Sequence, residues 1–386
     1  MIPYGKQEIT QQDIDAVLDV LKSDFLTQGP QVPLFEASIK KAVNADYALA
    51  VNSATSALHI ACLALGVGKG DVVWTTPITF VASANCALYC GADIDFVDIN
   101  SDTYNLCADK LEQKLIHAKA NDLLLPKVVI PVHLCGQPCK MDKIHKLGQE
   151  YGFSIIEDAS HAIGGKYKSK PIGNCEYSDI AIFSFHPVKI VTTAEGGVAT
   201  TNDPALAKKM ELLRSHGITR DTELMTEKSH GGWYYEQIEL GFNYRMTEMQ
   251  ATLGASQMSR LHDFVAKRNQ LAANYDQLLK NLPLITPIQS DDSYSGRHLY
   301  VIRLKLNEIS LSHKYVFEQL REKGIGVNLH YIPVHTQPYY KELGFVSGQF
   351  IESEKYYNDA ISIPLFHTMT QEQQDKVVSV LTEVLV

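Results

Sequence analysis

One lysine stands where a lysine can act as a nucleophile. Lys189 follows an apolar run at residues 179–185 that is typical of a buried strand, and it precedes the turn residues Gly196 and Gly197. A lysine at the edge of a core loses water around its ammonium group, which lowers its pKa toward the range where the free amine attacks a carbonyl carbon. The position is compatible with a Schiff-base lysine, but a single lysine at such a place is more often an ordinary surface lysine on a loop, so the interpretation depends on the other features of the chain.

Three further segments place polar or aromatic groups directly after an expected strand. Residues 52–58 (NSATSAL) join a strand to a helix, and their hydroxyl groups and free backbone N–H groups can hold an anion. Asp158 ends a strand and can face a protonated ring nitrogen, while Phe80 can stack on a planar ring. Taken singly, simpler explanations exist: Ser53, Thr55 or Asp158 can cap a helix, and phenylalanine usually fills a core.

The four features together favour a function over these simpler explanations. An anion seat, an aromatic side chain, a carboxylate and a lysine are what pyridoxal 5′-phosphate requires. They would anchor its phosphate, stack on its ring, hold the proton of its ring nitrogen and bind its aldehyde carbon. The sequence therefore predicts an enzyme that uses this cofactor.

The elements that must position these groups alternate along the chain. Short apolar runs are expected as strands at residues 47–51, 71–75, 94–97, 127–132, 153–157 and 179–185. Helical stretches separate them, for example at residues 55–65, 81–89 and 141–151. This alternation predicts βαβ units and an α/β fold with a mostly parallel sheet and helices on both faces. Ligands of such folds bind beyond the carboxyl ends of the strands.

The two ends of the chain differ from this central part. Ile14, Val17, Leu18 and Leu21 follow the capping candidate Thr10 at helical spacing, which predicts an amphipathic first helix. Beyond about residue 250 we expect a long polar helix (250–281), a loop (290–296), a strand (300–306), a helix (313–323), a strand (360–364) and a last helix (371–385). We therefore predict a large cofactor-binding domain with the N-terminal segment at residues 1–255, and a smaller C-terminal α/β domain at residues 256–386.

Composition excludes several classes of protein. The 386 residues are 45% hydrophobic and 20% charged, which is typical of a globular chain rather than a disordered one. No apolar run is long enough for a membrane span and the N-terminus has no apolar signal core, so a cytosolic protein is expected. The net charge of −9 gives no basic footprint for nucleic acid. The seven cysteines form no Cys-x-x-Cys pair, and no metal site is predicted.

Six motifs make the chain resemble a known family. It is similar, from Tyr4 to about Leu365, to the DegT/DnrJ/EryC1/StrS family of nucleotide-sugar aminotransferases, which have the fold of type I pyridoxal-phosphate enzymes. The motifs are LTQG (26–29), NSATSAL (52–58), EDASH (157–161), the Lys189 segment through EGG (195–197), GFNYRMTE (241–248) and HYIPVH (330–335).

The resemblance implies a role for individual residues around pyridoxal 5′-phosphate. These are Lys189 as the Schiff-base lysine, Asp158 as partner of the ring nitrogen, Phe80 on the ring, Ala54, Thr55 and Ser184 at the phosphate, His161 beside the 3-hydroxyl, and Asn243 reaching the phosphate in a neighbouring subunit. A homodimer with active sites at the subunit interface is implied as well.

A narrower resemblance concerns the substrates. Residues 3–6, 76–80 and 185–186 look most like members that aminate C4 of a UDP-linked 4-keto-6-deoxy-N-acetyl sugar on the way to pseudaminic acid, with L-glutamate as the expected donor. The implied substrate-binding candidates are Tyr4, Thr27, Asn328, His330 and Tyr331. The group that receives the carboxylates of the donor stays open between Arg245, Arg297 and several histidines.

Three alternatives to this substrate and this activity remain. Another nucleotide-linked keto sugar is one. A lyase of the same fold that removes a sugar hydroxyl would be expected to carry histidine in place of Lys189. A regulatory protein that binds the cofactor without catalysis is disfavoured by the intact set of Lys189, Asp158 and Thr55.

Overall fold

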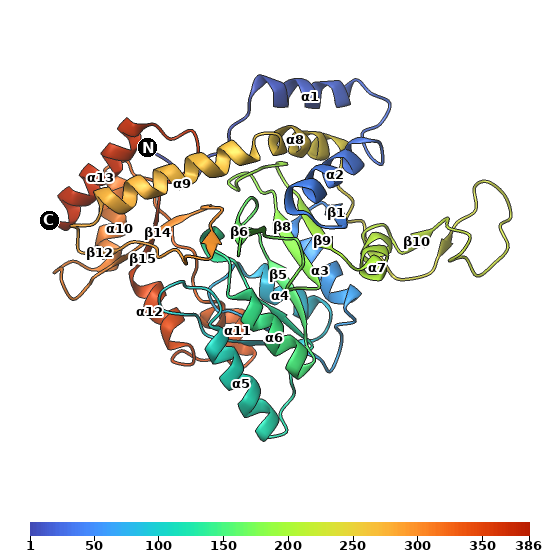
Figure 1. Cartoon of the computed structure of the whole chain (residues 1–386), viewed down its shortest axis with the longest axis horizontal. Coiled ribbons are helices and arrows are strands. Elements are labelled where there is room, and N and C mark those ends of the chain that lie inside the picture. Colours follow the sequence, from blue (N-terminus) through green and yellow to red (C-terminus); the bar gives the residue numbers. More distant parts are fainter.

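A seven-stranded sheet organises the chain. The computed structural model describes all 386 residues, and its largest sheet has the strand order β1-β9-β8-β5-β4-β2-β3 with helices on both faces (Figure 1). The strands are β1 (Tyr47–Val51), β2 (Val72–Thr75), β3 (Asp93–Phe96), β4 (Val128–Ile130), β5 (Ser154–Asp158), β8 (Ile180–Ser184) and β9 (Gly197–Thr201). The expected α/β fold with a mostly parallel sheet is confirmed.

One strand of this sheet runs against the others. β9 pairs antiparallel with both β1 and β8, whereas the pairs β8–β5, β5–β4, β4–β2 and β2–β3 are parallel. The carboxyl ends of β1, β2, β5 and β8 therefore meet at one edge of the sheet. β9 lies outside the strands expected from the sequence.

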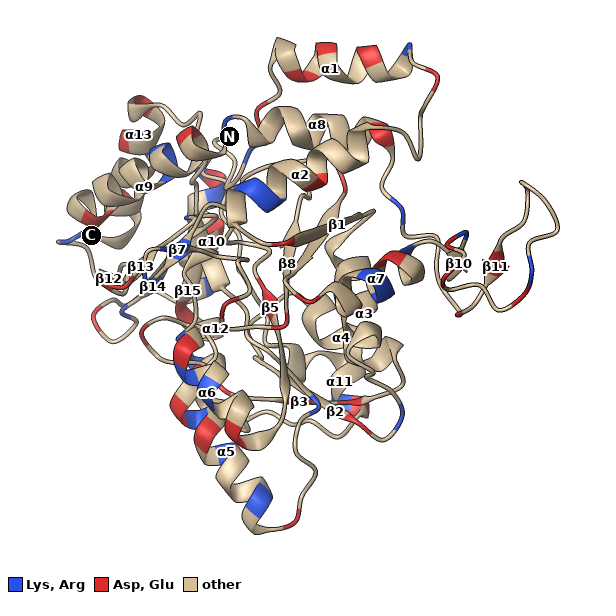
Figure 2. Cartoon of the chain, turned by 45° about the vertical axis from the view of Figure 1, so that its right-hand side comes forward, with Lys and Arg blue, Asp and Glu red and all other residues tan.

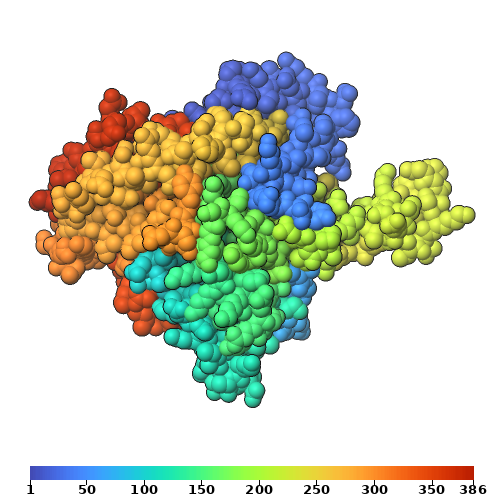
Figure 3. Space-filling model, in the orientation of Figure 1, coloured from blue at the N-terminus to red at the C-terminus, as the bar shows by residue number.

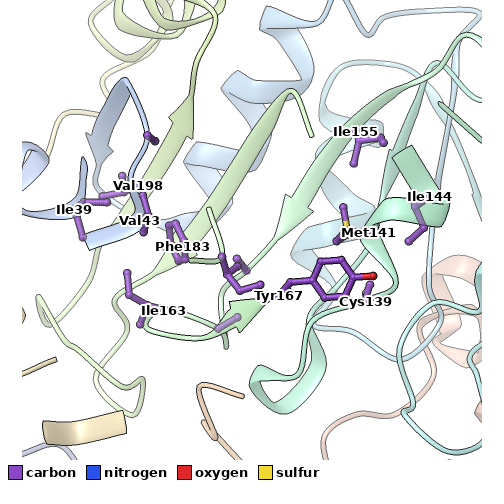
Figure 4. Packing of buried hydrophobic residues seen from close by; sticks show 14 of the residues in the cluster. Ile39, Val43, Cys139, Met141, Ile144, Ile155, Ile163, Tyr167, Phe183 and Val198 are labelled. Carbon is purple, nitrogen blue, oxygen red and sulfur yellow. The ribbon is translucent and has the colours of Figure 1, made fainter. Parts of the chain in front are cut away.

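Alternating residues of each strand face two hydrophobic cores. Ala48 and Ala50 of β1 join the core on one face, and Leu49 and Val51 join the core on the other. The first core is covered by α2 (Gln31–Val43), α5 (Ala108–Ala120) and α6 (Met141–Tyr151), and the second by α3 (Ala54–Ala64), α4 (Ala82–Tyr89) and α7 (Pro204–Arg214). Figure 4 shows part of the first core, where Ile39 and Val43 of α2 lie near Phe183 and Val198 of the sheet. Full burial of such side chains stabilises the fold by about 1.5–3 kcal/mol each.

The C-terminal part builds a core of its own around a three-stranded antiparallel sheet. Its elements are α9 (Leu261–Leu278), β12 (Leu284–Ile285), β14 (Tyr300–Leu304), α10 (His313–Glu322), β15 (Ala360–Ile363) and α13 (Gln371–Leu385). Ile2 packs into this core and pairs with Ile325, so the first residues of the chain run beside the C-terminal elements. The division of the chain at residue 255 stays a prediction.

The prediction of a single helix at residues 250–281 is wrong. The chain forms α8 (Glu248–Met258) and α9, and Ser259 and Arg260 lie between them. Neither residue is glycine or proline, so the sequence carries no strong signal for the break. Short elements complete the fold: β6 (Lys166–Tyr167), β7 (Lys170–Pro171), β13 (Ser293–Tyr294), α11 (Pro338–Glu342), α12 (Ile351–Asp359) and the 3-10 turns Leu134–Gly136 and Val334–Thr336.

The first helix, α1 (Gln11–Leu21), turns its apolar face outward. Asp13 is buried instead, and its carboxylate accepts hydrogen bonds from Ser256, Gln257 and Arg260 of the α8–α9 region at 2.6–3.0 Å. Ile14, Leu18 and Leu21 are 49%, 42% and 54% exposed. The predicted first helix is confirmed, and most of its apolar residues face away from the core of their own chain.

A long arm leaves the body of the molecule between α7 and α8. It comprises residues 218–240, with β10 (Ile218–Thr219) and β11 (Glu236–Gln237) at its base, and it stands clear of the rest in Figures 1 and 3. Trp233 and Leu240 on the arm are 74% and 78% exposed. None of the helices combines the length and the apolar character needed to span a lipid bilayer.

Candidate active site

A cavity of about 550 Å³ opens at the edge of the sheet where β1, β2, β5 and β8 end. It brings together eleven of the thirteen predicted site residues: Tyr4, Ala54, Thr55, Phe80, Asp158, His161, Ser184, Lys189, Asn328, His330 and Tyr331. Thr27 and Asn243 do not line it. The loops that follow parallel strands thus converge on one site, as expected for a sheet of this kind.

The start of α3 forms the anion seat. The Ser53 hydroxyl caps the helix by accepting a hydrogen bond from the backbone N–H of Ser56 at 3.1 Å, while Ala54 and Thr55 line the cavity. Capping and anion binding are therefore compatible, because the first N–H groups of a helix have no carbonyl partner within it. Gly197 of β9 lies so close that an added Cβ would be 2.5 Å from the nitrogen of Ala54. The glycine thus lets β9 pass directly beside the seat.

The seat holds no fixed cation. α3 contains no Lys, Arg, Asp or Glu and is tan throughout in Figure 2, as is α4. Apart from Lys189, neither lysine nor arginine lines the cavity. An anion here would be held by the backbone N–H groups, the positive end of the helix dipole and the hydroxyl groups of Thr55 and Ser184.

Phe80 and Asp158 offer two kinds of contact for a planar ring. Phe80 follows β2 and remains 58% exposed, so its face is free in the cavity rather than packed in the core. Asp158 is only 5% exposed and accepts a hydrogen bond from Ser83 at 2.6 Å and one from the backbone N–H of Ser160 at 3.1 Å. The neighbouring Glu157 is bonded instead to His133 at 2.8 Å, since successive strand residues face opposite sides. Of these two neighbouring carboxylates, only that of Asp158 therefore lines the cavity.

Lys189 lies in a turn after β8 and its side chain lines the cavity. Burial of the ammonium group lowers the pKa of Lys189 from 10.5 to about 8, although the negative charge of Asp158 acts in the opposite direction. At neutral pH the free amine is thus several hundred times more abundant than at an ordinary lysine, following the shift of about 2.5 pH units. The residue has the electrostatic environment that imine formation needs.

Neutral imidazoles also line the cavity. His161 Nδ1 accepts the backbone N–H of Cys135 at 3.2 Å, and its Nε2 lies 3.2 Å from the Tyr331 hydroxyl. Burial and the nearby charge of Lys189 hold the pKa of His161 well below its usual range and lower that of His330 to about 3. The N–H of neutral His161 is therefore on Nε2 and points to Tyr331, whose own proton is free for a ligand.

The rate at which the protein captures pyridoxal 5′-phosphate is expected to depend on pH through Lys189. Only the free amine attacks an aldehyde, so the capture rate should rise about tenfold per pH unit below pH 8 and level off above it. Stopped-flow absorbance of cofactor-free protein would measure this profile. Lys69→Ala, which alters an exposed lysine, should leave the midpoint unchanged. A midpoint near 10.5, as for an ordinary lysine, would contradict the geometry described here.

Several lining residues escaped the sequence analysis. Ser83, on the first turn of α4, and His298, in the loop before β14, carry no motif that marks them, and only the fold brings them to the cavity. Thr79, Ser160, His186 and Glu195 also line it, and they lie within segments that the motifs had marked. The sequence motifs could therefore have identified these four residues as candidate site residues.

Two predicted residues and two candidate arginines lie elsewhere in the chain. Thr27 pairs with Thr247, and Asn243 pairs with Ser215 and is exposed. Arg245 donates a hydrogen bond to the Ser215 hydroxyl, and Arg297 lines a separate small cavity with Tyr104 and Leu299. No arginine of this chain therefore reaches the cavity.

The site groups fit pyridoxal 5′-phosphate. The cavity presents an anion seat without an acidic side chain at the start of α3, the free ring face of Phe80, a carboxylate at Asp158 and a lysine with a lowered pKa. These four groups lie at or after the carboxyl ends of four different strands and line one cavity.

Comparison with known proteins gives consistent matches over the whole chain. The sequence pattern of the DegT/DnrJ/EryC1/StrS aminotransferase family matches residues 7–382. A UDP-4-amino-4,6-dideoxy-N-acetyl-beta-L-altrosamine transaminase of Campylobacter jejuni is 38% identical over 100% of this chain and 98% of its own.

Solved structures agree. An aminotransferase of Helicobacter pylori involved in pseudaminic acid biosynthesis superposes with a TM-score of 0.90 at 30% identity, covering 100% of this chain and 99% of the other. A putative sugar aminotransferase of Streptococcus pneumoniae in its PLP form superposes with a TM-score of 0.88 at 28% identity, covering both chains completely.

Proposed function

The chain belongs to the DegT/DnrJ/EryC1/StrS aminotransferase family and is a pyridoxal-phosphate-dependent sugar aminotransferase that acts on nucleotide sugars, and from this premise we propose its substrates. It transfers the amino group of L-glutamate to C4 of a UDP-linked 4-keto-6-deoxy-N-acetyl sugar, in the synthesis of a pseudaminic acid precursor. The observation that carries this proposal is the 38% identity, over the full chain, to a transaminase named for such a sugar.

Six residues take the chemical roles. When bound, the cofactor carries the amino group between the two substrates and draws electrons from the carbon that loses its proton. Lys189 holds the cofactor covalently, and its released amine moves a proton away from Cα of the donor. Asp158 keeps the proton on the ring nitrogen, and Phe80 stacks on the ring. Thr55 and Ser184, together with the backbone of Ala54, hold the phosphate.

The sugar nucleotide is proposed to enter along the wall formed by Tyr4, Asn328, His330 and Tyr331, which line the cavity on the side of the C-terminal elements. The Tyr331 hydroxyl, whose own proton is free, can donate to an oxygen of the sugar. Because burial raises the pKa of Tyr331, this hydroxyl stays protonated during turnover.

A second copy of the chain is proposed to complete the site. Thr27 and Asn243 carry family motifs but do not line the cavity of their own chain. The outward apolar face of α1 and the exposed arm 218–240 are unusual for a monomer, since large exposed apolar surfaces generally mark an interface. We therefore propose a homodimer in which Thr27 and Asn243 serve the site of the partner.

The substrate proposal is tested with purified enzyme, L-glutamate and a panel of UDP-linked 4-keto sugars. We expect amination of the 4-keto-6-deoxy-N-acetyl sugar, detected as a mass change of the sugar nucleotide. Tyr331→Phe, which removes a single hydroxyl, should raise KM for the sugar nucleotide about tenfold while KM for glutamate changes less than about twofold.

The outcome can contradict the substrate and leave the family chemistry intact. An enzyme that exchanges amino groups between amino acids and keto acids but ignores every UDP-linked 4-keto sugar would refute the proposed acceptor. Equal rises of both KM values in Tyr331→Phe would refute the assignment of this residue to the sugar. Lys69→Ala serves as the control for the effect of purification and handling.

A further inference from the structure

The carboxylate of Asp158 is held by a hydroxyl group from another part of the fold. Its Oδ2 accepts a hydrogen bond of 2.6 Å from Ser83, which lies 75 residues earlier on α4, and its Oδ1 accepts the backbone N–H of Ser160 at 3.1 Å. Ser83 and Asp158 are both buried. A buried ionised carboxylate is stabilised by such donors, and bonds to a charged group are stronger than those between neutral groups.

The direction of the protons in this network follows from the bond between Ser83 and Asp158. The Ser83 hydroxyl lies 2.7 Å from the hydroxyl of Thr79, and either oxygen alone could be the donor. The Ser83 hydroxyl donates its single proton to Asp158, so Thr79 must donate to Ser83. The backbone carbonyl of Phe80 is a more distant acceptor for Ser83 at 3.3 Å.

The two hydroxyl residues flank the ring-stacking candidate. Thr79 immediately precedes Phe80, and Ser83 follows it by three residues at the start of α4. β4 lies between β2 and β5 in the sheet, so no backbone pairing joins the loop of Phe80 to the strand of Asp158. The hydroxyl pair makes this connection through side chains.

We propose that Ser83 and Thr79 are positioning residues. They fix the Asp158 carboxylate toward the ring nitrogen of the cofactor and hold Phe80 in a constant position relative to this carboxylate. With one oxygen bonded to Ser160 and the other to Ser83, the carboxyl group cannot rotate freely. Asp158, Phe80, Thr79 and Ser83 all line the cavity. This inference rests on the role proposed above for Asp158, and it does not depend on the identity of the sugar.

The test uses binding and spectra rather than turnover. The dissociation constant of pyridoxal 5′-phosphate is measured with cofactor-free protein by fluorescence quenching, and the absorbance of the bound cofactor is recorded against pH. The pH at which this absorbance changes reports the protonation of the imine nitrogen, which depends in turn on the charge of the ring nitrogen. Ser83→Ala should weaken binding about tenfold, equivalent to about 1.4 kcal/mol, and shift the pH at which the spectrum changes. Thr79→Val should act in the same direction with a smaller effect, and Thr79→Ser, which keeps the hydroxyl, should restore the wild-type values.

Thr75→Val is the matched control. The Thr75 hydroxyl is also buried and donates to the carbonyl of Ile130 at 2.8 Å, but it does not touch Asp158 or the cavity. This variant should lose some thermal stability and keep the wild-type dissociation constant and spectrum. If it changed the spectrum as much as Ser83→Ala does, a general loss of packing would explain both, and the proposal would fail.

Other outcomes separate this inference from the role of Asp158. A folded Ser83→Ala protein with a wild-type spectrum and dissociation constant would overturn the proposal. If Ser83→Ala does not fold, equal values in Thr79→Val and Thr79→Ser would overturn it instead. An unchanged spectrum in Asp158→Asn would show that Asp158 itself is not the partner of the ring nitrogen. The positioning role proposed for Ser83 and Thr79 would then fail as well.

Discussion

Lys189→Ala should lower kcat for the reaction with glutamate, and for the reaction with the sugar, by at least about 10³-fold, because it removes both the covalent attachment and the group that moves the proton. The variant should still bind the cofactor noncovalently, since the anion seat, Phe80 and Asp158 remain. Single-turnover absorbance in each half of the reaction would measure the loss. Borohydride reduction of the wild-type enzyme, followed by peptide mapping, should place the cofactor label on Lys189.

Lys69→Ala is the control for this experiment, since Lys69 is exposed on a turn remote from the cavity residues. It should keep wild-type activity and the same labelled peptide. A borohydride label on any other lysine, or a Lys189→Ala protein within about tenfold of the wild-type rate, would show that a different amine does the chemistry.

Mixing two inactive variants should regenerate activity if the sites are shared between subunits. Lys189→Ala lacks the nucleophile, and Asn243→Asp would place a negative charge beside the phosphate of the partner's cofactor. After subunit exchange, half of the twofold-symmetric dimers are hybrids with one intact site, so about a quarter of wild-type activity should return. The measurement is the specific activity of the mixture against time, with hybrid formation checked by native mass spectrometry.

The same mixture distinguishes the competing arrangement. The backbone carbonyl of Asn243 lies 3.4 Å from the Asn52 side chain of its own chain, next to the anion seat. If the Asn243 side chain served its own subunit, every site in a hybrid would carry one of the two lesions and no activity would return. A fully active monomer would also refute the shared site.

Local patterns were enough to predict most of the sheet and the residues that follow its strands. Lys189, Asp158 and the segment of Thr55 each lie at a junction between an apolar run and a turn, and such junctions are visible in the sequence. The parallel sheet then places all of these junctions at one edge. The positions of Ala54, Thr55, Phe80, Asp158, His161, Ser184 and Lys189 around one cavity follow from this rule. Tyr4, Asn328, His330 and Tyr331 lie outside this sheet and were implied by the family resemblance alone, and the individual roles of all eleven residues stay predictions.

The features that escaped prediction depend on contacts between distant segments. The bond between Ser83 and Asp158 spans 75 residues, and a buried serine in a helix has no sequence mark of such a partner. β9 begins at a glycine of the turn, and its antiparallel direction is set by pairing with β1 and β8, which lie far away in the sequence or across that turn. The apolar residues of α1, which face outward, have the same spacing as the apolar residues of a helix that packs on the core. The spacing indicates an amphipathic helix, but it does not indicate which surface covers the apolar face.

The absence of a fixed cation from the start of α3 has a consequence for how the enzyme behaves in different solutions. Attraction between full charges is screened by salt over a Debye length of about 8 Å at physiological ionic strength. Hydrogen bonds of the kind proposed for the backbone of Ala54 and the hydroxyls of Thr55 and Ser184 act at contact and are screened much less. If these groups hold the phosphate as proposed, its noncovalent affinity should fall only weakly as the salt concentration rises, whereas a site built on lysine or arginine would lose affinity steeply.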